Sequence, residues 1–125
     1  MSKPAALLPK LDKICSRLPE SVRLDQNSHA TFLVRKKPFV YFLNDHHADG
    51  IIGIACKALP GDNQRLIDSD PARFYMPAYV GPRGWVGLRL DTPKIDWEEV
   101  AELILGSYLL TAPKTLARLV EGSNT

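Results

Sequence analysis

Residues 74–90 read FYMPAYVGPRGWVGLRL, a stretch that predicts a turn followed by a strand. Residues 81–84, Gly-Pro-Arg-Gly, are a turn signal because proline fixes φ and glycine tolerates positive φ. Val86, Leu88 and Leu90 alternate with other side chains, which is the period of a strand with one buried face. If the residues before the turn pair with this strand, the unit is a β-hairpin with Arg83 at its tip.

Trp85, Gly87 and Arg89 then lie on the opposite face of the strand. A glycine between tryptophan and arginine has two interpretations. It leaves room for a ligand to approach the backbone, or it accommodates a neighbouring aromatic side chain within the protein. The second interpretation is favoured, because most strand glycines serve packing.

Strands are expected before this unit in short apolar runs bounded by turn residues, at residues 21–25, 31–35, 38–43 and 51–57. The run 51–57 is continuously apolar and predicts a central strand. Within residues 38–43, period two places Phe39, Tyr41 and Leu43 on one face and Val40 with Phe42 on the other.

Helices are expected where apolar side chains recur at helical spacing, at residues 4–18, 62–70, 96–111 and 114–120. Asp96 and Glu99 form a capping-box pattern at the start of the third of these. Strands joined by short turns predict an antiparallel sheet, and the few helices predict an α+β fold with helices packed on one sheet face.

The length of the chain predicts one domain over residues 1–125, because a chain of this length can bury a core without disulfides or metals. The net charge of +2 is too small to indicate nucleic-acid or membrane binding by itself, so only local charge matters. Cys15 and Cys56 lie in apolar segments and are interpreted as small buried hydrophobes. We see neither a signal peptide nor a membrane span, and we expect a cytoplasmic monomer.

Several motifs together are similar to one known family. They are residues 29–32 (HATF), 45–50 (DHHADG), 56–61 (CKALPG), 70–87 (DPARFYMPAYVGPRGWVG), 96–97 (DW), 107–108 (SY) and 112–114 (APK). On these motifs the chain resembles the MmcQ/YjbR-like family from its first helix to Val120. A departure is Ala30, where many members have proline, and it should alter only the start of that strand.

The resemblance implies a compact CyaY-like arrangement, with a sheet covered on one face by helices. It implies a small soluble protein of a family whose function is mostly unknown. DNA binding has been suggested for the family from a double-wing shape. The resemblance supplies no catalytic residues, and we expect no cofactor and no enzymatic activity.

Histidines and carboxylates invite a metal or catalytic interpretation. His46, His47 and Asp49 are suitable metal ligands, but adjacent histidines point apart on an extended chain and no closed ligand set is visible. We therefore expect a turn with exposed histidines and no metal. His29 beside Thr31 is expected to be a hydrogen-bonded structural residue rather than an acid–base catalyst.

Basic residues at the two predicted turns support the leading hypothesis, a binding protein that contacts DNA. One turn presents Arg35, Lys36 and Lys37. The other hairpin presents Arg83 at its turn and Arg89 along its outer face, and these five residues are the candidate contacts. Two basic turns on one sheet could straddle a phosphate backbone, although lysines at turns are also common solubility features.

The alternative hypothesis is a module for a small anionic ligand or a protein partner. Its candidate residues are His29, Thr31, Lys57, Tyr79 and Trp85, with Arg89 beside them. A preformed concave pocket at Trp85 would favour this alternative over DNA binding, and a flat face there would count against it.

Overall fold

The computed structural model describes residues 3–26, 29–44 and 50–123. Its elements follow in the order α1 (Lys3–Cys15), β1 (Ser21–Gln26), β2 (His29–Val34), β3 (Lys37–Asn44), β4 (Ile52–Lys57), α2 (Asp62–Ser69), β5 (Phe74–Tyr75), the 3-10 helix Gly81–Arg83, β6 (Trp85–Arg89), α3 (Trp97–Thr111) and α4 (Lys114–Ser123). Each predicted helix and strand is present, with ends that differ by a few residues.

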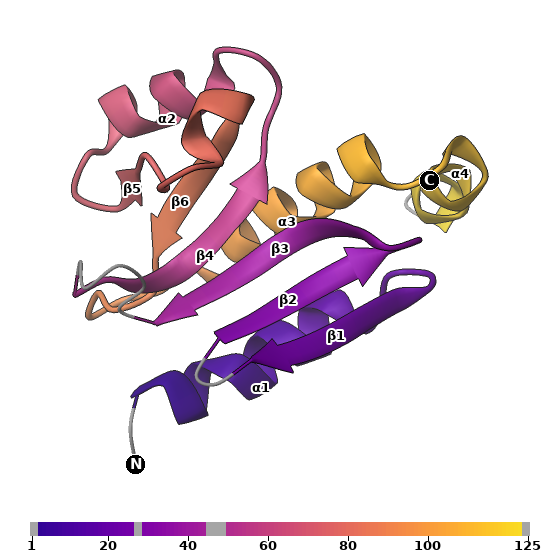
Figure 1. The fold of residues 1–125 in the computed structure, drawn as a ribbon, viewed down its shortest axis with the longest axis horizontal. Helices are drawn as coiled ribbons and strands as arrows, with labels where there is room; N and C mark the ends of the chain where they lie inside the picture. The colour runs from indigo at the N-terminus through magenta and orange to yellow at the C-terminus, as the bar shows by residue number, and fades with distance from the viewer. Residues whose placement is uncertain (1–2, 27–28, 45–49, 124–125) are drawn as a thin grey trace.

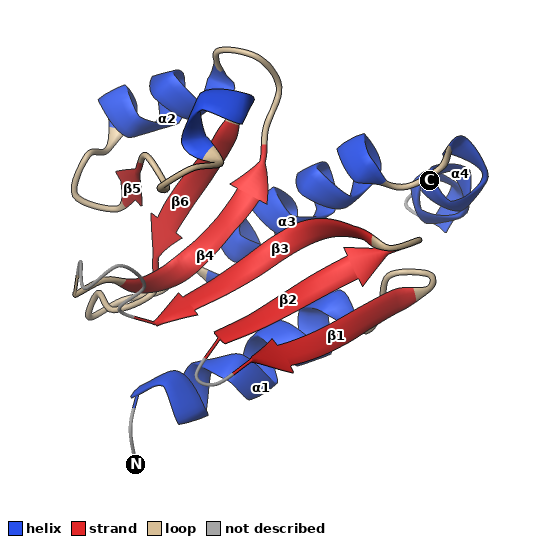
Figure 2. Cartoon of the chain, in the orientation of Figure 1, coloured by secondary structure: helices blue, strands red, loops and turns tan. Residues whose placement is uncertain are grey.

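The strands form one antiparallel sheet in the order β1-β2-β3-β4-β6-β5. Figure 1 shows α1 and α3 on the same side of the sheet, behind β1–β2 and β3–β4 respectively. Figure 2 shows α2 beside the β5–β6 end of the sheet and α4 beyond the end of α3. The predicted α+β fold, with helices on one face of an antiparallel sheet, is confirmed.

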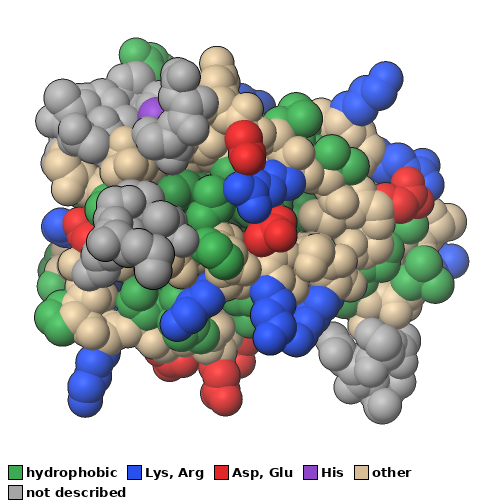
Figure 3. All heavy atoms as spheres, turned by 90° about the horizontal axis from the view of Figure 1, so that it is seen from below, with side chains coloured by type: hydrophobic (Ala, Val, Ile, Leu, Met, Phe, Trp, Pro, Cys, Tyr) green, Lys and Arg blue, Asp and Glu red, His purple; other side chains and the backbone are tan. Residues whose placement is uncertain are grey.

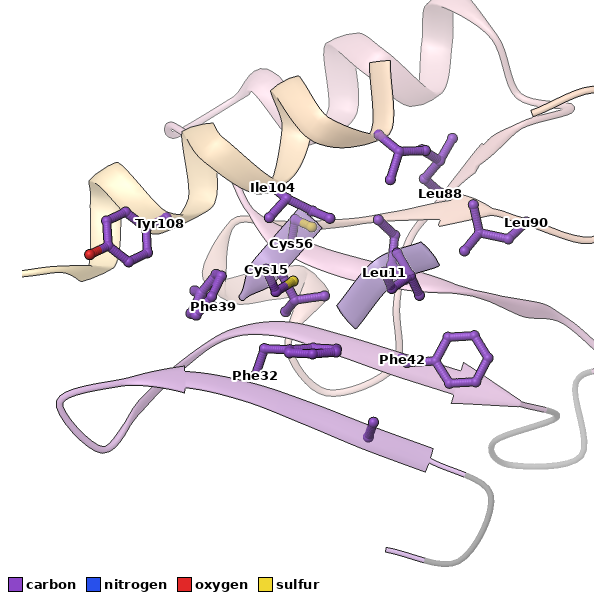
Figure 4. Packing of buried hydrophobic residues seen from close by; sticks show 14 of the residues in the cluster. Leu11, Cys15, Phe32, Phe39, Phe42, Cys56, Leu88, Leu90, Ile104 and Tyr108 are labelled. Carbon is purple, nitrogen blue, oxygen red and sulfur yellow. The ribbon is translucent and has the colours of Figure 1, made fainter. Parts of the chain in front are cut away.

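The core lies between the sheet and the two helices α1 and α3. In Figure 4 the rings of Phe32, Phe39 and Phe42 lie between their strands and α3. Tyr108 on α3 contacts Phe39 edge to face, with ring centroids 5.4 Å apart. Its hydroxyl donates to the carbonyl of Pro19 at 2.7 Å, which satisfies the one polar group of this ring.

Phe39 lies on the opposite face from the one predicted. Strand pairing shifts between Phe32 and Leu33, which oppose Val40 and Pro38, so Phe39 is an extra residue in β3. Such a β-bulge turns two successive side chains to the same side. Phe39 and Val40 are both fully buried in the core, while Tyr41 stays on the other face of the sheet.

The turn between β2 and β3 consists of Arg35 and Lys36, with φ values of 50° and 68°. Positive φ at both central residues of a two-residue turn is the geometry that suits a twisted hairpin, and glycine or asparagine usually occupies it. The Arg35 guanidinium donates to both carboxylate oxygens of Glu20, at 2.6 and 2.9 Å. This exposed ion pair links the turn to the start of β1.

Residues 74–90 form a hairpin with a long connection. Phe74 and Tyr75 pair with Leu88 and Gly87 on β6. A Cβ on Gly87 would lie 2.4 Å from the ring of Tyr75, so that ring occupies the space beside the glycine. The packing interpretation of Gly87 is therefore confirmed.

The N-terminus of α3 is held by two separate contacts. Asp96 caps it by accepting hydrogen bonds from the backbone N–H groups of Glu98 and Glu99, at 3.1 and 3.2 Å. The Glu99 carboxylate accepts from Arg73, which also donates to Asp70 at 2.6 Å. The Asp96 half of the predicted capping box is confirmed, whereas the Glu99 side chain pairs with Arg73, which links the start of β5 to α3.

Candidate functional site

A pocket of about 480 Å³ opens where β3 begins, β4 ends and α3 ends. It is lined by Lys37, Pro38, Tyr41, Lys57, Val80, Arg83, Trp85, Leu110 and Thr111. We call it the cationic pocket, because its charged lining residues are two lysines and one arginine and none is acidic.

Strand register and turn geometry bring the three cations together. Lys57 ends β4 directly opposite Trp85, the first residue of β6. Lys37 begins β3 next to the hairpin turn. Arg83 is the last residue of a 3-10 helix that ends at Gly84, whose φ of 96° favours glycine. The pocket therefore combines residues from three separate strand ends.

Ser107 on α3 holds the strands apart beside this pocket. Val40 pairs with Cys56, so the next pair along the ladder would be Phe39 with Lys57. In its place, the Lys57 backbone N–H donates to the Ser107 hydroxyl at 2.8 Å, and that hydroxyl donates to the Phe39 carbonyl at 2.6 Å. The fully buried hydroxyl thus bridges two strands where they separate.

Asn63 on α2 holds the connection between β5 and β6. Its side-chain nitrogen donates to the carbonyls of Gly81 and Trp85, at 3.0 and 3.1 Å. Asn63 is only 8% exposed, so these carbonyls have little access to water in its place. The position of Arg83 therefore depends on a side chain from α2.

Among the described residues, two of the predicted basic contacts form ion pairs, whereas the three cations that line the pocket do not. Within the described ranges, Lys37, Lys57 and Arg83 have no carboxylate within 4.0 Å, and the exposed Lys36 has none either. Arg89, in contrast, donates to both carboxylate oxygens of Asp91, at 2.9 and 3.0 Å. Unpaired cations that share one concavity form a site for an anion.

Basic and acidic side chains are mixed on the face of the molecule seen in Figure 3. A basic group lies between two acidic ones near the centre of that face. The net charge of +2 is therefore not spread as a uniform basic field over that face. Local grouping in the cationic pocket is what distinguishes its cations.

Two aromatic rings form part of the cationic pocket. Tyr41 and Trp85 have ring centroids 5.2 Å apart and planes at 38°. Trp85 is only 6% exposed, so it offers no free stacking surface. Tyr79 is 80% exposed, has a φ of 66° and is not part of the lining.

The remaining predicted ligand residues lie elsewhere. Through its Nε2, His29 donates to the Asn44 carbonyl at 3.1 Å, a structural hydrogen bond like the one expected. Thr31 pairs with Tyr41 on the neighbouring strand but does not line the pocket. His46, His47 and Asp49 lie outside the described residues. Among residues that are described, no group of three His, Cys, Asp or Glu side chains could hold a metal ion.

The two thiols are unsuited to chemistry at neutral pH. Burial raises the pKa of Cys15 to about 12, with a smaller contribution from Asp12. Burial also raises the pKa of Cys56 well above its ordinary value. Both groups remain protonated core side chains, as predicted.

Some residues that form or support the pocket are not predicted from the sequence, among them Tyr41, Asn63 and Ser107. Ser107 had a detectable signal, because it lies on the apolar stripe of α3 between Ile104 and Tyr108. A serine on a buried stripe implies a hydrogen-bond partner. Tyr41 and Asn63 had no such signal, since their roles depend on elements that are distant in sequence.

Asp91 makes the stability of this region depend on pH. Hydrogen bonds from Arg89 and from the Ile52 backbone lower the pKa of Asp91 below its ordinary value, although partial burial opposes them. A carboxylate with a lowered folded-state pKa stabilises the protein at neutral pH and loses that contribution as pH falls below about 4.

We therefore expect Asp91→Asn to be less stable than the wild type at pH 7. The difference should narrow between about pH 4 and pH 2, because the wild-type carboxylate becomes protonated there. Urea denaturation at a series of pH values measures this. A stability difference that stays constant down to pH 2 would contradict the assignment.

Comparison with known protein families identifies the family to which this chain belongs. The family model of YjbR matches residues 16–110, which is most of the chain and includes Lys37, Lys57, Arg83 and Trp85. The chain belongs to the YjbR family. The predicted resemblance is thus confirmed over this range. No curated protein matches the chain.

A solved structure supports the fold. The crystal structure of the Deinococcus radiodurans protein DR2400, which carries a DUF419 domain, matches with a TM-score of 0.66 and 24% sequence identity. The match covers 82% of this chain and 76% of that one. In the described part of this YjbR-family chain, no helix has the length and apolar character needed to cross a membrane.

Proposed function

We propose that this chain is a non-enzymatic protein that binds small phosphorylated molecules in the cationic pocket. The observation that carries the proposal is the convergence of Lys37, Lys57 and Arg83 on one concavity whose lining contains no carboxylate. A phosphate group accepts charge-assisted hydrogen bonds from such side chains. Concavity beside Trp85 also favours a small ligand over an extended one.

The chemistry of the lining supports binding rather than catalysis. Besides its cations, the cationic pocket contributes apolar side chains, the ring hydroxyl of Tyr41 and the hydroxyl of Thr111. The Thr111 hydroxyl donates to the Ser107 carbonyl at 2.8 Å. A nucleophile with an adjacent general base is not among these lining residues.

Isothermal titration calorimetry with pyrophosphate tests the proposal. The wild type should bind at low salt, and binding should weaken as salt screens the cations. Lys57→Gln and Arg83→Gln should each weaken binding about tenfold or more, because a hydrogen bond to a charged group contributes about 1.5–3 kcal/mol.

Charge-matched controls come from elsewhere in the chain. Lys13→Gln on α1 and Arg118→Gln on α4 remove the same charges from exposed positions outside the pocket lining. They should leave pyrophosphate affinity within about twofold of wild type, since exposed distant charges are screened. Equal losses in the pocket variants and in these controls would reduce the effect to net charge and sink the proposal.

DNA binding is a second candidate, favoured by the turn between β2 and β3. Arg35 and Lys36 occupy positive-φ positions that glycine or asparagine would adopt with less strain. Strained positions of this kind often accompany function. Lys36, Lys37 and Arg83 are exposed, whereas Arg35 and Arg89 are already paired with Glu20 and Asp91.

The combined change Arg35→Asn and Lys36→Gly tests this candidate without harming the turn, because that pair suits the backbone geometry. If DNA contacts the turn, fluorescence anisotropy should show weaker binding of short duplex and single-stranded DNA, with a smaller salt dependence. Unchanged DNA affinity, or no binding by the wild type at low salt, would exclude the turn as a DNA contact.

A further inference from the structure

A second depression, between α2 and α3, adjoins the cationic pocket. This depression has a volume of about 310 Å³, and five leucines line it, namely Leu59, Leu66, Leu103, Leu109 and Leu110. We call it the apolar groove. Lys57 and Leu110 line both spaces as well as a third of about 460 Å³ that also contains Arg83. The cationic pocket and the apolar groove therefore adjoin each other, with the cations on one side and the leucines on the other.

Gly106 forms part of the apolar groove and has no evident structural reason to be glycine. The other glycines whose surroundings are described have a positive φ or a close neighbour, namely Gly50, Gly61 and Gly84 for the first reason and Gly53, Gly81 and Gly87 for the second. A Cβ on Gly106 would meet nothing within 4 Å. Glycine is a poor residue for a helix interior, so its effect here is to keep the groove open.

The charged lining residues differ between the cationic pocket and the apolar groove. The cationic end has three basic residues and no acidic lining residue, whereas Asp62 and Glu102 line the apolar groove. An anionic group is attracted to the first end and repelled from the second. Leu59 and Leu110 are 55% and 39% exposed, so an apolar group in the groove would cover leucine surface that now contacts water.

We propose that the ligand is an aliphatic phosphate monoester, with its phosphate in the cationic pocket and its hydrocarbon chain in the apolar groove. This inference rests on the proposed function, which concerns the phosphate alone. Three cations suit a phosphate dianion better than a single carboxylate charge. A hydrocarbon chain also suits the leucine lining, because a peptide would bring backbone polar groups that need hydrogen-bond partners there.

A series of ethyl, butyl and hexyl phosphate below their aggregation concentrations tests the inference by calorimetry. Affinity should rise about twofold for each added methylene, less than the roughly fourfold of complete burial because the groove is open. Pyrophosphate reports on the phosphate site alone. Heptanoate, whose carboxylate carries the same six-carbon chain but a smaller charge, should bind more weakly than hexyl phosphate.

Gly106→Leu is the decisive variant, because Gly106 lines the apolar groove, has open space beside it and is not a lining residue of the cationic pocket. It should bind pyrophosphate and ethyl phosphate like the wild type but lose the gain with chain length. Its melting temperature should not fall, since leucine favours helices more than glycine does. Thr115→Leu adds the same side chain on exposed α4 and should keep the gain.

The possible binding results separate the inference about the hydrocarbon chain from the proposed function. Affinity that grows with chain length in the wild type and in Thr115→Leu, but not in Gly106→Leu, supports the inference. Pyrophosphate binding with no chain-length dependence overturns the inference and leaves the proposed function intact. Chain-length dependence that survives Gly106→Leu overturns the groove assignment, and tighter binding of heptanoate than of hexyl phosphate overturns the assignment of a phosphate headgroup. Absence of binding by every phosphate overturns both proposals.

Discussion

Ser107→Ala should lower the free energy of unfolding by about 2–4 kcal/mol. The change removes the hydroxyl that joins the Lys57 N–H to the Phe39 carbonyl, both next to a fully buried core. Each buried backbone group left without a partner costs about 1–3 kcal/mol. Partial closure of β3 on β4 limits the loss, because the two groups could then bond directly.

Thr111→Ala is the matched control for this prediction. It deletes a hydroxyl one turn later on the same helix, where Thr111 donates to the Ser107 carbonyl at 2.8 Å and is only partly buried. That carbonyl lies within α3, so we expect a loss under about 0.5 kcal/mol, offset by the better helix propensity of alanine. Urea denaturation measures both variants. Equal stability of the two would show that the Ser107 bridge contributes nothing.

Asn63→Ala should have the second large effect, a loss of about 2–3 kcal/mol. Its side chain donates to two carbonyls in the connection that carries Arg83, and alanine leaves both without that donor. The amides of Gly84 and Trp85, which donate to Gly81 and Val80, should exchange with deuterium faster in the variant. Affinity for pyrophosphate should fall as well, because Arg83 loses its fixed position.

Two further variants make this prediction specific to hydrogen-bond donation. Asn63→Asp keeps the shape but offers only acceptors to two carbonyls, so it should be at least as unstable as Asn63→Ala. Gln64→Ala removes a neighbouring exposed amide that donates to Asp68 at 2.8 Å, and its effect should be within about 0.5 kcal/mol. An aspartate variant as stable as wild type would refute the role assigned to Asn63.

Local patterns were sufficient to predict most of the fold. The Asp96 cap and the alternation around Val86 are signals within a few residues of the elements that they define. Phe39 was placed on the wrong face because a β-bulge depends on how two strands align. Period two assumes a regular strand, and the local sign of the irregularity is Pro38, since proline within a sheet is confined to edge strands, strand starts and bulges.

The candidate site could be predicted only in part. The sequence predicts four of its lining residues, Lys37 and Arg83 as DNA contacts and Lys57 and Trp85 as ligand residues. It groups the second pair with His29 and Thr31, which lie outside the cationic pocket. The pairing of β4 with β6 passes over α2 and β5, and it is this pairing that sets Lys57 opposite Trp85. Whether a basic residue is free or paired also depends on distant partners, as Arg35 with Glu20 demonstrates.

The most direct test of the phosphate site is an amide NMR titration of the wild type with pyrophosphate. We expect shifts that saturate together at the backbone amides of Lys37, Lys57 and Arg83 and at the indole N–H of Trp85. The indole N–H signal of Trp97 should not shift. The same titration of Lys57→Gln should need a much higher concentration. Shifts confined to other regions, or none at low salt, would contradict the central claim that the cationic pocket binds phosphate.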